Sequence, residues 1–205
     1  MYDWIFRKNN LYPDKILGSK AYQKAEVGKF LLGQYGAGIG ATVGKSYTQQ
    51  IPPSPGGQGG SFRKTNGIKL AAFTVLNSLG DIYGPFGDVI YGAKLSKEFK
   101  ENHIFSSLSA RDSRRKKGNT TLSLIVTNVN LEHFEMRSLA RQMHNSFAEV
   151  IRPYGTIFDG DTLYFVSTKE IHLSCRERDS LCFNIGLLAS DLIKEAVYSA
   201  VNIDR

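Results

Sequence analysis

Asn119 and Thr120 stand where a heavily charged segment ends and an apolar, β-branched run at 122–126 begins. If the bond between them breaks, Thr120 becomes a new N-terminus, with a hydroxyl nucleophile beside its own freed α-amine. That amine has an ordinary pKa of about 7.7–8.0, so it can accept a proton near neutrality. A loop that simply enters a strand would give the same residues, and this plainer interpretation stays open.

A second group of candidate residues is the tripeptide Asp159-Gly160-Asp161, which precedes an apolar run at 163–166. On an extended chain, residues two apart project to the same face, about 7 Å apart. Gly160 leaves the space between the two carboxylates free of a side chain. When two carboxylates lie this close together, the pKa of one of them is raised, which suits proton transfer around a nucleophile. A solvated Asp-Gly turn or a weak cation site is the alternative.

The glycine-rich segment 36–46 ends in Gly44-Lys45-Ser46. A phosphate-binding loop requires a glycine five positions before Gly44, and Ile39 occupies that place. The dinucleotide-binding spacing is met only in a looser variant, and the preceding residues predict a helix rather than a strand. We therefore interpret the segment as a path along which the backbone approaches another group closely, with Lys45 at its end.

Five blocks along the chain together resemble one family, the self-cleaving aminopeptidases. This family includes the L-aminopeptidase/D-esterases, the β-peptidyl aminopeptidases and the nylon-oligomer hydrolases. The blocks occur in the family's order and at compatible spacing. They are Tyr12-Pro13-Asp14 with Leu17-Gly18 and Ala21, Gly36 to Lys45, residues 75–81, Asn119-Thr120-Thr121-Leu122, and Ile151-Arg152-Pro153 with residues 158–162. Each block is a weak signal alone, whereas five in order make a strong joint one.

The resemblance implies a cleavage between Asn119 and Thr120 that yields the fragments 1–119 and 120–205. Thr120 would be the nucleophile, created when its hydroxyl attacks the Asn119 carbonyl and the resulting ester hydrolyses. Fragment 1–119 would then stay associated with fragment 120–205.

The resemblance also implies the roles of four further catalytic residues. Asn77 would donate its amide to the oxyanion that develops on the attacked carbonyl. Lys45 would stabilise charge or tune the amine of Thr120. Asp159 and Asp161 would orient Thr120 and shuttle protons.

The fold that the resemblance implies is α/β, a four-layer αββα sandwich of two stacked sheets between helices. One catalytic domain would cover residues 1–205. Family members carry a long segment ahead of the Tyr-Pro-Asp block, and Met1 stands almost at that block. We therefore expect a sandwich that is incomplete at the N-terminus and that exposes apolar sheet edges. Expressed alone, residues 1–205 are expected to be poorly soluble or inactive.

Two classes of function fit these observations. The first is an amide hydrolase that matures by self-cleavage and then acts on peptides or small amides. The second is a non-catalytic fragment or subunit that needs a partner chain for the missing N-terminal half. No cofactor and no metal are expected. As partners we expect copies of the same chain, in a homo-oligomer, or a chain that supplies the missing half.

Composition indicates an ordinary intracellular domain, with 41% hydrophobic and 22% charged residues. No apolar run reaches the eighteen or so residues of a membrane span, and the N-terminus does not resemble a signal peptide. Cys175 and Cys182 lack metal-ligand spacing, so we expect reduced thiols in a cytoplasmic protein. The basic cluster at 111–117 has no interleaved aromatics, which favours a solvated loop over nucleic-acid binding.

Hydrophobic periodicity predicts the elements that position these residues. Helices are expected at 14–32, 131–150 and 181–201, and strands at 67–77, 87–93, 121–128 and 161–168. Two segments, 49–61 and 96–118, are expected to be flexible, the first because of its Pro and Gly residues.

Overall fold

The computed structural model describes residues 13–47, 51–93, 95–96, 98–99, 101–102 and 118–202. Its centre is a four-stranded sheet in the order β3-β4-β7-β9. These strands are β3 (Gly57–Thr65), β4 (Ile68–Asn77), β7 (Thr120–Val129) and β9 (Thr162–Ile171). Neighbouring strands are antiparallel except for β7 and β9, which run parallel.

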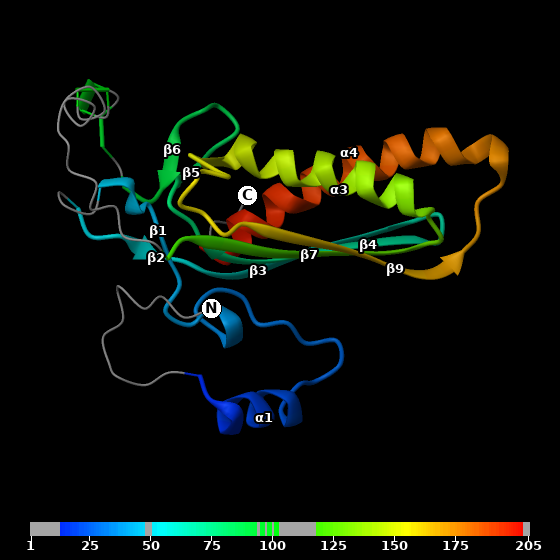
Figure 1. Cartoon of the computed structure of the whole chain (residues 1–205), viewed down its shortest axis with the longest axis horizontal. Coiled ribbons are helices and arrows are strands. Elements are labelled where there is room, and N and C mark those ends of the chain that lie inside the picture. Colours follow the sequence, from blue (N-terminus) through cyan, green and yellow to red (C-terminus); the bar gives the residue numbers. More distant parts are fainter. Residues whose placement is uncertain are drawn as a thin grey trace.

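Two long helices, α3 (His133–Val150) and α4 (Cys175–Ala200), lie along one face of this sheet (Figure 1). The core lies between them and the strands, and its largest fully buried side chains include Leu76, Ile125, Phe147 and Leu192. No helix in the described part of the chain is both long and apolar enough to cross a bilayer.

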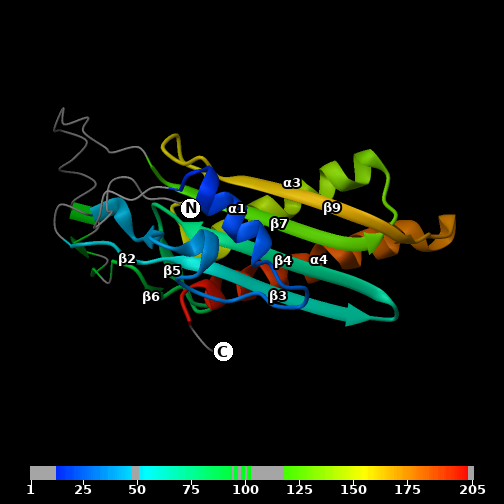
Figure 2. The ribbon, with the colours of Figure 1, turned by 90° about the horizontal axis from the view of Figure 1, so that it is seen from below.

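Shorter elements surround one end of the large sheet. A three-stranded sheet has the order β6-β5-β8, and a two-stranded sheet joins β1 to β2. Their bounds are β1 (Thr42–Val43), β2 (Ser54–Pro55), β5 (Asp81–Tyr83), β6 (Val89–Tyr91) and β8 (Ile151–Arg152), with the 3₁₀ turns η1 (Gly36–Gly38) and η2 (Lys45–Tyr47). Helix α1 (Lys15–Gln23) lies on the side of the large sheet opposite α3 and α4 (Figures 1 and 2) and has no buried residue.

Side chains alternate between the two faces of the large sheet. On β7, Thr121, Ser123 and Ile125 are buried, whereas Leu122 and Leu124 stay 39% and 37% exposed. Successive residues of a strand point to opposite faces, so one face carries the helices and the other is only partly covered. We call this second face, which carries Leu122 and Leu124, the open face.

Most of the expected elements are confirmed with shifts of a few residues at their ends. The last helix begins at Cys175, six residues before the expected start. The helix expected at 14–32 is wrong beyond Gln23. Its apolar residues do not extend the helix, because the Phe30 ring packs on Phe73 of β4 with centroids 4.9 Å apart. Most of the segment 96–118 lies outside the described residues.

The expectation of irregular structure over 49–61 is wrong, because strand β3 begins at Gly57. Its glycines allow the backbone of α4 to pack directly on the strand. A Cβ on Gly59 would lie 1.9 Å from the carbonyl oxygen of Ala196, and one on Gly57 would lie 2.4 Å from that of Ala200. Glycine in this strand therefore marks a close approach of two backbones rather than a flexible loop.

We predict that Gly59→Ala destabilises the fold, because the added methyl group cannot be accommodated unless α4 moves away from β3. Overpacking of this kind costs about 1–3 kcal/mol of unfolding free energy, measurable by urea denaturation. Gly18→Ala in α1 is the matched control, since a Cβ there meets nothing within 4 Å. Equal stability of the two variants would contradict the proposed contact.

Candidate active site

The pairing of β4 with β7 places two of the predicted site residues opposite each other. Asn77, the last residue of β4, is the register partner of Thr120, the first residue of β7. Asn77 is 1% exposed, whereas Thr120 is half-buried. Because side chains alternate along a strand, Thr120 shares the open face with Leu122 and Leu124.

Lys45 holds the Asn77 side chain in one orientation. Its buried Nζ donates to Asn77 Oδ1 at 2.7 Å, to the Asn77 carbonyl oxygen at 3.1 Å and to the Gly118 carbonyl oxygen at 3.4 Å. The main-chain N–H of Thr42 also donates to Asn77 Oδ1, at 2.9 Å. Since both neighbours are donors, the atom that they face must be the amide oxygen. Asn77 Nδ2 then donates to the Gly118 carbonyl oxygen at 2.9 Å.

The Asn119 carbonyl, at the predicted cleavage point, accepts two hydrogen bonds. Thr120 Oγ1 donates to this oxygen at 2.5 Å, and the main-chain N–H of Gly160 donates to it at 2.9 Å. Asn119 forms an isolated parallel bridge with Asp159, which brings the two chain segments together. The hydroxyl of Thr120 therefore lies beside the carbonyl group that it would attack.

The two aspartates make different contacts. Asp161 uses both carboxylate oxygens, accepting from the Thr121 N–H at 2.6 Å and from the Gly155 N–H at 3.1 Å. Asp159 Oδ2 accepts from the N–H of Thr156 at 2.9 Å and from its hydroxyl at 2.7 Å. Among the described residues, Asp159 Oδ1 is buried with no hydrogen-bond partner.

Burial of this region shifts the pKa values of two groups. It raises the pKa of Asp161 above its ordinary value of 3.8, the N–H groups of Thr121 and Gly155 oppose that rise, and the charge of Asp159 adds to it. The second carboxylate, which the sequence predicts to raise one pKa of the pair, is therefore one cause of the rise, and burial is the larger cause. Burial, together with the charges of Asp161 and Asp159, also raises the pKa of Tyr154, so its phenol stays protonated at neutral pH.

Gly160 and the glycine-rich segment act as expected, by allowing close approach. A Cβ on Gly160 would lie 2.9 Å from Thr120 Oγ1. Gly44, just before Lys45, has φ +74°, and a Cβ there would lie 2.7 Å from the N atom of Ala93. The backbone can therefore bring Lys45 beneath Asn77 only with glycine at this point.

Several groups of the site were missed by the sequence analysis. The Thr42 N–H, the Gly118 carbonyl and the Gly160 N–H belong to the main chain, and main-chain groups leave no mark in residue types. Thr156 could have been found, because a threonine three positions before Asp159 is a common turn arrangement for side-chain hydrogen bonding. Among the residues described, no three His, Cys, Asp or Glu side chains are arranged to hold a metal ion.

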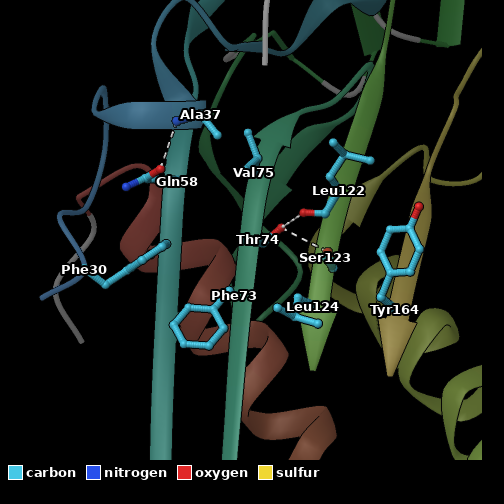
Figure 3. A pocket seen from close by; sticks show the side chains of 10 residues that line it. All are labelled: Phe30, Ala37, Gln58, Phe73, Thr74, Val75, Leu122, Ser123, Leu124 and Tyr164. Carbon is cyan, nitrogen blue, oxygen red and sulfur yellow. Dashed lines mark hydrogen bonds between the residues drawn. The ribbon is translucent and has the colours of Figure 1, made fainter. Parts of the chain in front are cut away.

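Next to Thr120, the open face carries a shallow and mostly apolar hollow of about 200 Å³. Leu122, at its edge, is two residues from Thr120 along β7, a distance of about 7 Å. The lining residues, shown in Figure 3, are Phe30, Ala37, Gln58, Phe73, Thr74, Val75, Leu122, Ser123, Leu124 and Tyr164. The edge of the hollow at Leu122 is therefore one side-chain spacing along the open face from the candidate nucleophile.

Proteins of similar sequence include a "Putative NylC-analogous protein" of Agromyces sp. (strain KY5R), 35% identical over 98% of this chain and 68% of its own length. A "6-aminohexanoate-oligomer endohydrolase" of Paenarthrobacter ureafaciens is 35% identical over 98% of this chain and 59% of its own length. The chain thus spans about three fifths to two thirds of these relatives.

Solved structures share the fold. The L-aminopeptidase D-Ala-esterase/amidase of Ochrobactrum anthropi, described as a variant of the Ntn hydrolase fold, matches with a TM-score of 0.60 and 18% identity over 91% of this chain and 49% of its own. A β-aminopeptidase of Burkholderia sp. matches with a TM-score of 0.57 and 14% identity over 89% and 50%. The expected layered α/β class is confirmed. Residues 7–203 match the description "Peptidase family S58", and the chain therefore belongs to that family.

Proposed function

We propose that this chain carries the catalytic groups of an amide hydrolase that cleaves itself between Asn119 and Thr120. The observation that carries the proposal is the position of Thr120 Oγ1, opposite Asn77 and 2.5 Å from the carbonyl oxygen of Asn119. Membership of a peptidase family supports amide bonds as the class of bond that is broken. The site would thus form the fragments 1–119 and 120–205 within the single domain 1–205.

The self-cleavage requires two steps. Thr120 Oγ1 bonds to the Asn119 carbonyl carbon and gives up its proton, while the carbon–nitrogen bond breaks and the nitrogen takes a proton. The product is an ester between Asn119 and the side chain of Thr120. Water then hydrolyses this ester, which leaves Asn119 as a carboxylate and Thr120 with a free hydroxyl and a free α-amine. That amine can act as the base of the mature enzyme.

The two aspartates are proposed to have different roles in self-cleavage. Asp161 positions the strand, because both of its oxygens hold main-chain N–H groups of Thr121 and Gly155. Asp159 accepts the proton, because its main chain pairs with that of Asn119 and its buried Oδ1 has no hydrogen-bond partner among the described residues.

Lys45 and Asn77 are proposed to serve the mature enzyme. In the uncleaved chain, Asn77 Nδ2 is occupied by the Gly118 carbonyl. Once the segment that ends at Asn119 can move away, the same N–H group can donate to the carbonyl oxygen of a substrate. The ammonium group of Lys45, bonded to Asn77 Oδ1, would strengthen that dipole in a buried site.

The proposed substrates are peptides or small amides. The apolar hollow beside Thr120 supports an acyl group with an apolar stretch, and one relative is named for acting on 6-aminohexanoate oligomers. The assembled site favours the hydrolase over the non-catalytic subunit that the sequence left open. A cytoplasmic location is part of the proposal, supported by the free thiol of Cys182.

The open face is proposed to be covered by a further layer, from a partner chain or from copies of this chain. Phe73 and Val75 of β4, with Leu122 and Leu124 of β7, form an apolar surface on it. The solved structures that share the fold are about twice as long as the part that this chain matches. A chain that supplies the second sheet of the sandwich would bury this surface.

We predict that this chain, purified after co-expression with the N-terminal part of a relative, consists of two associated fragments whose intact masses correspond to 1–119 and 120–205. Thr120→Ala removes the nucleophilic oxygen and should abolish cleavage, whereas Thr120→Ser should retain part of it. The matched control is Thr121→Ala, the same change one residue along on the opposite face of β7, which should leave cleavage in place. If the Ala variant at 120 is still cut, or if the new N-terminus lies elsewhere, the assignment of Thr120 is wrong.

Asp159→Asn should slow maturation by about 100-fold or more, the contribution typical of a general base. Because the amide is isosteric with the carboxylate and can still accept from Thr156, the unfolding free energy should change little. The measurement is the rate of fragment formation after refolding, followed by mass spectrometry, beside urea denaturation of the same sample.

The exposed Asp191→Asn is the control for charge alone and should mature at the normal rate. Normal maturation in Asp159→Asn would contradict its role as proton acceptor.

Asp161→Asn tests the positioning role proposed for Asp161. Because the pKa of Asp161 is raised above 3.8 in the folded protein, its carboxyl group should lower the free energy of unfolding as pH rises from 3.8 to that raised pKa. The Asn variant should lose this pH dependence of unfolding.

We further predict that the N-terminal part of the Paenarthrobacter ureafaciens endohydrolase, co-expressed with this chain, co-purifies with it. Leu124→Lys should abolish the association, because a charge on the open face cannot be buried against a second sheet without a partner. Phe86→Lys, at an aromatic side chain that is 95% exposed between β5 and β6, should not. Equal recovery of both variants, or no recovery with the unchanged chain, would reject the open face as the docking surface.

A further inference from the structure

Within the part of the chain that the structure describes, only one group that contacts the carbonyl oxygen of Asn119 is suited to stabilising a negative charge on it before cleavage. Asn77, the expected oxyanion donor, points its Nδ2 at the carbonyl of Gly118, one residue upstream. Thr120 Oγ1 donates to the Asn119 oxygen, but this hydroxyl must lose its proton in order to attack. The remaining donor among the described residues is the main-chain N–H of Gly160, at 2.9 Å.

We infer that the main-chain N–H of Gly160 is the oxyanion donor of the self-cleavage step, a task separate from that of Asn77 in substrate hydrolysis. This inference rests on the proposed cleavage between Asn119 and Thr120. When Oγ1 bonds to the carbonyl carbon, the electron pair of the C=O bond moves onto the oxygen that Gly160 already contacts. When the carbon–nitrogen bond breaks, the pair returns and the ester carbonyl forms.

The geometry fits this task in three respects. The N–H is fixed before the reaction, because the bridge between Asn119 and Asp159 sets the position of the following residue. Its distance of 2.9 Å lies in the range of about 2.7–3.1 Å that oxyanion donors adopt. Glycine is required at this place, since a Cβ would lie 2.9 Å from the nucleophile itself.

The flanking residues explain why a main-chain donor is used. Asp159 and Asp161 are both acidic, and a donor side chain between them would compete for their carboxylates. A main-chain N–H cannot turn toward them, because the strand entry holds it toward Asn119. The tripeptide can therefore place two carboxylates and one donor within three residues.

The test replaces the amide of Gly160 with an ester, by cell-free translation with a suppressor tRNA that carries glycolic acid. This change removes the N–H and adds no side chain. The control is the same replacement at Gly56, whose N–H donates to the Ala41 carbonyl oxygen at 2.7 Å, next to the pairing of β1 with β2. Maturation is followed by intact mass. Hydroxylamine cuts the ester intermediate after Asn119 and so reports the first step, and the mass of its products separates this cut from cuts at the introduced backbone ester or after Asn66.

We expect the ester at 160 to slow both fragment formation and hydroxylamine cleavage after Asn119 by about 100-fold or more, the usual cost of losing one oxyanion donor. The ester at 56 should leave both rates within a few-fold of normal. If the two esters behave alike, the N–H of Gly160 is an ordinary sheet hydrogen bond and the inference is wrong. Circular dichroism of each product shows whether it is folded, and a misfolded ester at 160 with a folded ester at 56 would also overturn the inference.

A failure of the inference about Gly160 is distinguishable from a failure of the proposed function. If the unmodified chain, with or without a co-expressed N-terminal partner, is never cut between Asn119 and Thr120, the proposed function fails. If that chain is cut and the ester at 160 is cut equally fast, only the inference about Gly160 fails.

Discussion

The register between β4 and β7 is the constraint on which the candidate site depends. It places Asn77, where β4 ends, opposite Thr120, where β7 begins. A slip of β7 by one residue would turn Thr120 toward the helices and move every β7 side chain to the opposite face of the sheet. Ile125 and Val129 would then leave the core, at about 1.5–3 kcal/mol for each side chain. The packing of the helices thus fixes the geometry of the chemistry at the end of the strands.

Lys45 is not part of the large sheet and enters the site from the glycine-rich segment. The lysine is almost fully buried, and its ammonium group faces three carbonyl or amide oxygens, from Asn77 and Gly118. A buried charge is tolerated only where such groups replace its water shell. The same contacts that make burial tolerable also fix the Asn77 amide, so stability and orientation come from one set of hydrogen bonds.

The side chains that the structure brings together at the candidate site could be named from the sequence more readily than the path of the chain. Thr120, the aspartates and Lys45 stand out by residue type and by their place beside apolar runs. The role of Asn77 came only from the resemblance, because an asparagine at the end of a strand has many ordinary uses. The glycines near Gly59 were misread, since composition does not distinguish a flexible loop from a strand on which a helix backbone lies. Main-chain donors such as the Gly160 N–H cannot be read from residue types at all.

The buried polar atoms that lack partners show where the fold departs from ordinary packing. In the described part of the chain they are Asn119 Nδ2, Thr121 Oγ1 and Asp159 Oδ1, all next to the bond proposed to break. Each such atom costs about 1–3 kcal/mol, and functional sites are where such costs are expected to concentrate. Cleavage would create an α-ammonium group with three N–H donors on Thr120, the residue that follows the bridge between Asn119 and Asp159, and Asp159 Oδ1 has no donor before cleavage. The uncleaved chain would then hold an acceptor whose donor appears only when the reaction is complete, which favours the cleaved form.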